Sequence, residues 1–122
     1  MALSTIILDG RVTQRLVKQT AAGNTADNDV VGKAPTLYGV RIKNLGVAAA
    51  TSWVKLYDAK SATNTDHPHF NLEVLAASDL NIQFPLGIVF ANGLCLRASS
   101  EADDTAGATA PADNINVVLL TN

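Results

Sequence analysis

Residues 37–44, Leu-Tyr-Gly-Val-Arg-Ile-Lys-Asn, decide the fold class of this chain. Apolar side chains stand at every second position from Tyr38 to Ile42, and the polar Arg41 and Lys43 fall on the alternate positions. Side chains alternate between the two faces of a strand, so this pattern indicates a half-buried β-strand. The same alternation recurs in three further segments, residues 70–75, 80–85 and 115–120. An all-β chain is therefore predicted.

Turn-forming residues indicate where these strands end. Asn92–Gly93 lies between the apolar segments 88–90 and 94–96, which predicts a two-residue hairpin with a type I′ turn. Pro85 has no N–H to give to a strand ladder, so we expect it to end a strand. Gly87 is then expected to let the chain reverse.

Seven or eight short strands with no segment of helical period predict a single antiparallel β-sandwich, jelly-roll-like. Residues 19–36 and 99–114 are rich in small and short polar residues and are expected to be long exposed loops, with a possible short strand at residues 30–31. We expect one compact domain overall, with an N-terminal strand or arm region in residues 1–29 and the sandwich in residues 30–122.

Composition excludes several classes of protein. The chain has 122 residues, 48% apolar and 16% charged, which fits one folded domain rather than a disordered segment. A net charge of −2 predicts no nucleic-acid partner, and no run approaches the roughly 20 apolar residues of a membrane span. The charge is uneven: residues 1–61 carry eight basic and four acidic side chains, whereas residues 62–122 carry one and seven. Strands of the two halves can interleave in space; if they do not, the uneven charge favours head-to-tail contacts between copies.

No residue cluster indicates catalysis. His67 and His69 share a face, but a zinc site needs two more ligands of suitable type, and an exposed loop leading into a strand is the alternative. Asp103 and Asp104 lack the spacing of a calcium loop. Cys95, the single cysteine, excludes an intrachain disulfide and is expected to be a packed thiol. Nucleophile-elbow and phosphate-binding glycine motifs are absent, so we predict no enzyme, no cofactor and no metal.

Candidate binding residues lie in two places. Residues 53–57 are apolar on both faces except at Lys55, which predicts a central strand or one covered by a partner. Trp53 and Tyr57 share one face of it, as an aromatic platform if exposed and as core if buried. Residues 6–8 are apolar on both faces, which suits a strand added to a neighbour's sheet or an ordinary first strand. The predicted partner-binding residues are Ile6, Ile7, Leu8, Arg11, Trp53 and Tyr57, together with the loops at 19–36 and 99–114.

Five segments in a fixed order carry a resemblance to a known group. They are residues 35–44 (PTLYGVRIKN), 53–58 (WVKLYD), 80–88 (LNIQFPLGI), 92–94 (NGL) and 115–120 (INVVLL). This order resembles small virion proteins of tailed phages, namely head decoration (cement) proteins and related β-sandwich modules, over roughly residues 30–122. The motifs are structural rather than catalytic.

The resemblance implies a non-enzymatic virion protein that is assembled in the host cytoplasm and located on the capsid exterior. It implies binding to the major capsid protein, stabilisation of the head lattice, and a homo-oligomer with a trimer favoured; neither nucleic acid nor a membrane is an expected partner. The alternative is a tail, baseplate or fibre-associated module that recognises a host surface glycan or another virion protein.

Overall fold

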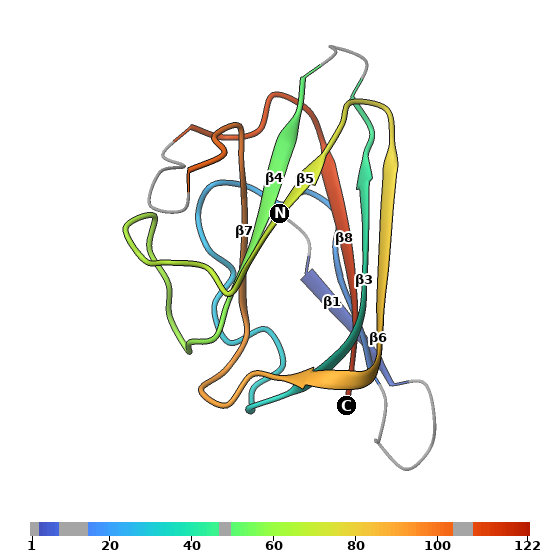
Figure 1. Cartoon of the computed structure of the whole chain (residues 1–122), viewed down its shortest axis with the longest axis vertical. Coiled ribbons are helices and arrows are strands. Elements are labelled where there is room, and N and C mark those ends of the chain that lie inside the picture. Colours follow the sequence, from blue (N-terminus) through green and yellow to red (C-terminus); the bar gives the residue numbers. More distant parts are fainter. Residues whose placement is uncertain (1–2, 8–14, 47–49, 104–108) are drawn as a thin grey trace.

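The computed structural model describes residues 3–7, 15–46, 50–103 and 109–122 (Figure 1). These residues form eight β-strands: β1 (Leu3–Ile7), β2 (Arg15–Gln19), β3 (Thr36–Asn44), β4 (Ser52–Tyr57), β5 (Phe70–Val74), β6 (Asp79–Val89), β7 (Cys95–Ser99) and β8 (Ile115–Thr121). The described part of the chain contains no helix, and so none that is long and apolar enough to cross a membrane. The all-β prediction is confirmed.

The strands form two antiparallel sheets that face each other. The large sheet has the order β1-β2-β8-β3-β6, and the small sheet has the order β5-β4-β7 (Figure 1). An isolated bridge between Asp27 and Leu96 places residues 20–35 beside β7. We count β2 as the first strand and residues 20–35 as the second, and β3 to β8 keep their numbers. The large sheet without β1 then has the order 1-8-3-6, and the small sheet has the order 2-7-4-5. That is the order of an eight-stranded jelly roll, so the predicted sandwich is confirmed.

The core lies between the two sheets and is built from the alternating positions of the strands. The large sheet contributes Val40, Ile42, Val117 and Leu119, and the small sheet contributes Val54, Leu56, Leu96 and Ala98, all buried. β4 is the central strand of the small sheet, as the apolar residues of segment 53–57 predicted.

Residues 20–35 do not form the exposed loop that their composition predicted. Their backbone pairs along the outer edge of β7: the N–H of Ala98 donates to the carbonyl of Gly23 at 2.8 Å, and the N–H of Val30 donates to that of Leu94 at 2.9 Å. The side chains of Ala22 and Val30 enter the core. Residues 30–31 form a turn instead of the expected short strand. The segment is ordered because it gives partners to the backbone groups of an edge strand.

The prediction that Pro85 ends a strand is wrong. β6 continues through it to Val89, because β6 is the outermost strand of the large sheet and Pro85 need not donate there. Gln83 pairs with Gly39 and Ile88 pairs with Leu37, so residues 84–87 bulge out of the ladder. Gly87 does not reverse the chain but serves this bulge, with a φ of 78° that a side chain would strain.

The predicted hairpin at Asn92–Gly93 is also wrong. β6 belongs to the large sheet and β7 to the small sheet, so residues 90–94 cross from one layer to the other. A type I′ turn needs positive φ at both central residues, whereas here Gly93 has a φ of 140° and Asn92 is not among the positive-φ residues. Gly93 serves a close approach instead, because a Cβ there would lie 2.9 Å from the carbonyl oxygen of Ala59.

Candidate interaction surfaces

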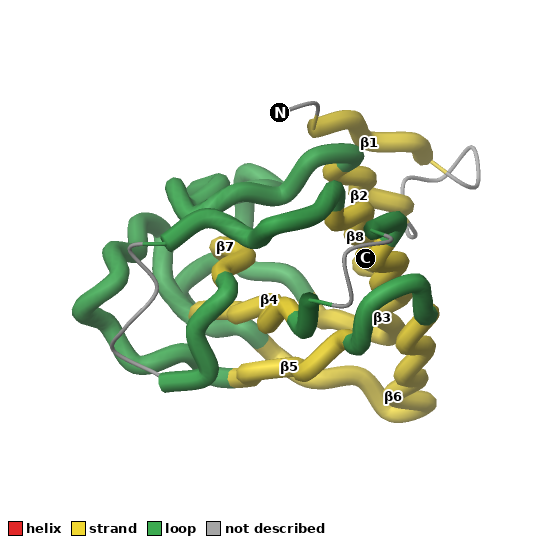
Figure 2. The backbone as a smooth tube through the Cα atoms, turned by 90° about the horizontal axis from the view of Figure 1, so that it is seen from above, coloured by secondary structure: helices red, strands yellow, loops and turns green. Residues whose placement is uncertain are grey.

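A layer of loops covers part of the outer face of the small sheet (Figure 2) and leaves Glu73 exposed. Beneath it lie two buried cations on neighbouring strands, Lys55 and Arg97. The Arg97 guanidinium donates from Nε and Nη2 to the hydroxyl oxygen of Tyr57 at 3.1 and 2.6 Å. Lys55 Nζ donates to the carbonyl of Asp103 at 2.7 Å and to Oδ1 of Asn71 at 3.3 Å. The bond to Asp103 ties the β7–β8 connection to the sheet.

Trp53 and Tyr57 do not form an exposed aromatic platform together. Tyr57 is only 1% exposed, because the loops close over its ring and Arg97 bonds its hydroxyl. Trp53 lies at the other end of β4 and is half-buried. Of these two predicted partner-binding residues, only Trp53 is accessible to a partner in the single chain.

Cys95 is a packed thiol and not a reactive one. It is fully buried beside Tyr57 and Ala62, and its Sγ donates to the carbonyl of Ala59 at 2.9 Å. Burial raises the pKa of this thiol above its usual value of 9.0. A thiol held protonated is a poor nucleophile at neutral pH.

The histidine pair and the acidic loop are not brought together with other ligands. His67 and His69 are exposed, and the ring of His69 packs against Phe70 and Phe90 at centroid distances of 5.3 Å. Asp104 lies outside the described residues. Within the described ranges, no three His, Cys, Asp or Glu side chains form a group suited to a metal ion.

The N-terminal candidates lie at an outer edge of the large sheet. Ile6 and Ile7 belong to β1, where they pair with Leu16 and Arg15 of β2. β1 stands at the end of the sheet opposite to β6 (Figure 2). Leu8 and Arg11 lie outside the described residues. Partner binding by this segment therefore stays a prediction.

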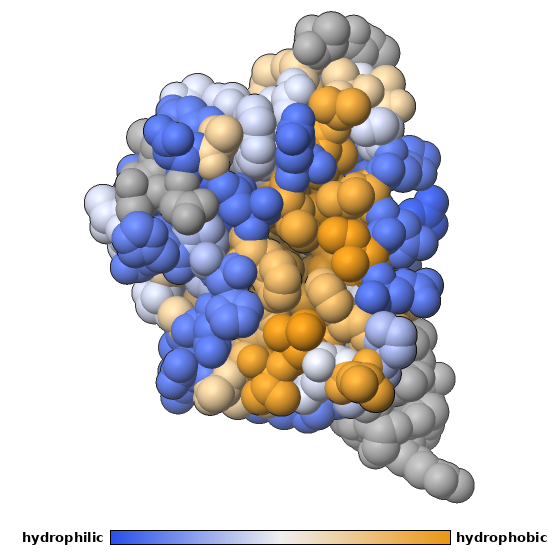
Figure 3. Space-filling model, in the orientation of Figure 1, coloured by the Kyte–Doolittle hydropathy of each residue, from blue (hydrophilic) through white to orange (hydrophobic). Residues whose placement is uncertain are grey.

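An apolar seam marks the side of the sandwich where β5 and β6 are the outer strands of their sheets. Its half-buried residues are Phe70, Leu72, Leu80, Phe84 and Ile88, and its exposed residues are Leu75, Leu86 and Val89. Leu86 is 97% exposed and Val89 is 65% exposed. Figure 3 shows a continuous apolar band down this side with hydrophilic groups on both flanks. The sequence prediction missed Leu86 because Pro85 and Gly87 indicated the end of a strand and a reversal of the chain. A leucine between two turn-forming residues was the feature that could have indicated an exposed apolar side chain.

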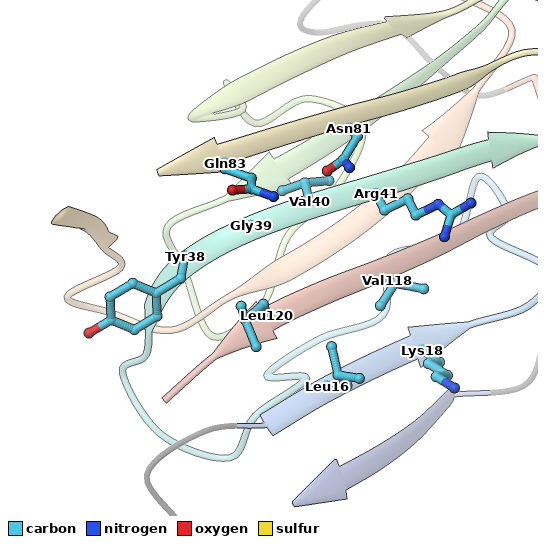
Figure 4. Close-up of a pocket in the computed structure, with 10 residues that line it drawn as sticks. All are labelled: Leu16, Lys18, Tyr38, Gly39, Val40, Arg41, Asn81, Gln83, Val118 and Leu120. Atoms are coloured by element: carbon cyan, nitrogen blue, oxygen red, sulfur yellow. The ribbon is translucent and has the colours of Figure 1, made fainter. Parts of the chain in front are cut away.

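A second surface is a shallow groove on the outer face of the large sheet. It has a volume of about 490 Å³ and lies over β2, β8 and β3. Its floor is apolar, formed by Leu16, Val118 and Leu120. Figure 4 shows Lys18 and Arg41 at one end of this groove and Tyr38 at the other. The residues that line it are Leu16, Lys18, Tyr38, Gly39, Val40, Arg41, Asn81, Gln83, Val118 and Leu120.

Comparisons with known proteins do not add to the fold assignment. No family model matches this chain, and no curated protein matches it. Among solved structures, the coat protein of Tobacco streak virus is similar, with 10% sequence identity and a TM-score of 0.36. That alignment covers 94% of this chain and 90% of the coat protein. Because this TM-score is low, the fold is assigned from the strand order of the chain itself.

Proposed function

We propose that this chain is a non-enzymatic structural protein of a virus particle, a decoration protein that binds the outside of an assembled capsid. The observation that carries this proposal is the apolar seam between β5 and β6, above all Leu86 with 97% of its surface exposed. A contiguous apolar patch on a soluble domain marks a surface for another protein. Burying a leucine side chain in such a contact contributes about 1.5–3 kcal/mol.

The fold suits a protein that clamps a lattice. Rigid strands carry the seam, so binding costs little ordering of the backbone. A protein that binds the assembled lattice more tightly than free subunits stabilises the lattice by mass action. Several copies in a symmetric cluster would add avidity, and the resemblance favours a trimer as that cluster. The resemblance of residues 30–122 to phage head decoration proteins supports the major capsid protein as the partner and the capsid exterior as the location.

The test is a binding measurement on capsids. Purified chain is mixed with phage heads that lack it, the heads are sedimented, and the copies retained per head are counted. We expect saturable retention at a copy number related to the symmetry of the lattice. Heads that retain no chain at any concentration would contradict the proposal.

A glycan-binding role in a tail or baseplate is the second candidate. It rests on Trp53, which is half-buried on the outer face of the small sheet, and it loses the support of Tyr57, which is buried. A stacked sugar would quench the emission of Trp53, the single tryptophan. Emission that stays constant across host polysaccharides would exclude this candidate.

A further inference from the structure

The two broad faces of the sandwich carry opposite charge. The outward positions of the large sheet present Lys18, Arg41 and Lys43, and the acidic Asp79 of this face lies 3.5 Å from Arg41. The opposite face, formed by the outer side of the small sheet and its loops, presents the exposed carboxylates of Asp66, Glu73 and Asp103. Its cations are the exposed Lys60 and the buried Lys55 and Arg97. The uneven distribution of charge along the sequence therefore corresponds to an uneven distribution over the two faces of the sandwich.

The groove on the large sheet divides into an apolar row and a cationic row. Leu16 pairs with Leu120 and Leu120 with Gly39, which gives one row across three strands. Lys18, Val118 and Arg41 form the next row in the same direction. Successive rows on one face of a sheet are two residues apart, about 7 Å. Gly39 deepens the apolar row because it carries no side chain.

The opposite face presents the complement. Trp53 lies directly across from Glu73 in the β4–β5 ladder. The Cβ atoms of such a pair are roughly 5 Å apart, so an indole stands beside an exposed carboxylate. Asp103 adds a second anion, and its chain segment is held in place because Asn71 Nδ2 donates to the Ala102 carbonyl at 2.6 Å and Lys55 to that of Asp103. This ordering lowers the entropic cost of docking.

We propose that a second copy of this chain docks the Trp53–Glu73 face of its small sheet into the groove on the large sheet of the first. Trp53 covers the apolar row at Leu16 and Leu120, and Glu73 lies beside the cationic row. The two surfaces are different patches of one molecule, so the contact is heterologous, and it repeats into an open filament unless a rotation between successive copies closes a ring. The role of this contact in a virus particle rests on the proposed function, whereas the contact between two copies can be measured on the purified chain.

The experiment measures self-association of the full chain by sedimentation velocity over a range of concentrations and salt. We expect association that weakens with salt and a blue shift of Trp53 emission as copies associate. Arg41→Glu and Glu73→Lys should each weaken association about tenfold, and their combination should restore it. Lys18→Glu tests the same row with a second variant. Lys33→Glu makes the same charge change outside the groove and is the matched control.

Three results would overturn the inference. The first is a wild-type chain that stays monomeric at several hundred micromolar, far above working concentrations. The second is association that neither Arg41→Glu nor Glu73→Lys weakens and that Leu86→Ser abolishes, which would assign the contact to the seam. The third is a double variant that stays as weak as the single variants. Retention of Arg41→Glu on heads tests the proposed function separately, since a variant that cannot self-associate can still bind a lattice through the seam.

Discussion

Replacing Leu86 by serine separates the stability of the chain from its binding. Leu86 is 97% exposed in the bulge of β6, so it packs against almost nothing within the chain. We expect Leu86→Ser to change the free energy of unfolding by less than about 0.5 kcal/mol. In the proposed contact, a buried leucine contributes about 1.5–3 kcal/mol. Binding to heads should therefore weaken about 10- to 150-fold per copy.

The assay is retention of the chain on sedimented heads at concentrations below saturation, with urea unfolding as the check on stability. Leu45→Ser is the matched control, because Leu45 is an exposed leucine between β3 and β4 that belongs neither to the seam nor to β1. We expect the control to bind as the wild type does. If Leu86→Ser folds normally and binds heads with wild-type affinity, the seam does not mediate the contact and the reasoning fails.

Three further substitutions or titrations test the interior. Tyr57→Phe removes the acceptor of two hydrogen bonds from the buried Arg97 guanidinium, so unfolding should cost about 1.5–3 kcal/mol less and Tm should fall by about 6–12 °C; an unchanged Tm contradicts this. Gly87→Ala places a Cβ at a φ of 78° and against Cγ2 of Thr36, and it should lower the free energy of unfolding in urea by more than about 1 kcal/mol. Gly39→Ala meets ordinary contacts and should not. Because burial raises the pKa of Cys95, the folded chain holds this proton more tightly than the unfolded chain. The contribution of Cys95 to stability should be constant below pH 9.0 and be lost as pH rises above it, and this loss should be absent in Cys95→Ala.

Local alternation predicted the strands because it reports which face of a segment is buried. Val117 and Leu119 alternate with outward side chains in β8, and Val40 and Ile42 do so in β3. The connection at Asn92–Gly93 was predicted wrongly because its form depends on which sheet the next strand joins. That choice is made by contacts far away in the chain, such as the pairing of β7 with β4. A turn dipeptide carries no information about it.

The candidate site was less predictable than the fold for the same physical reason. Lys55 and Arg97 occupy outward positions of their strands, where a charged residue ordinarily meets water. Here the loops return over that face, and Tyr57, Asn71 and the Asp103 carbonyl accept hydrogen bonds from the two cations. The cationic row on the large sheet, in contrast, could have been predicted from Lys18 and Arg41 if the strand order had been known.

The strand edges on the two sides of the sandwich differ in whether other residues cover them, and this difference indicates how a partner binds the seam. On the β7 side, residues 20–35 cover the edge and pair with its backbone. On the other side, β5 and β6 are outer strands, and no described residue pairs with their outer edges. β6 carries Pro85 and a bulge, two features that discourage addition of a further strand. Around Leu86 the edge of β6 therefore disfavours β-pairing while its apolar side chains remain exposed, so we expect a partner to meet this part of the seam with an apolar surface of its own rather than with an extended strand.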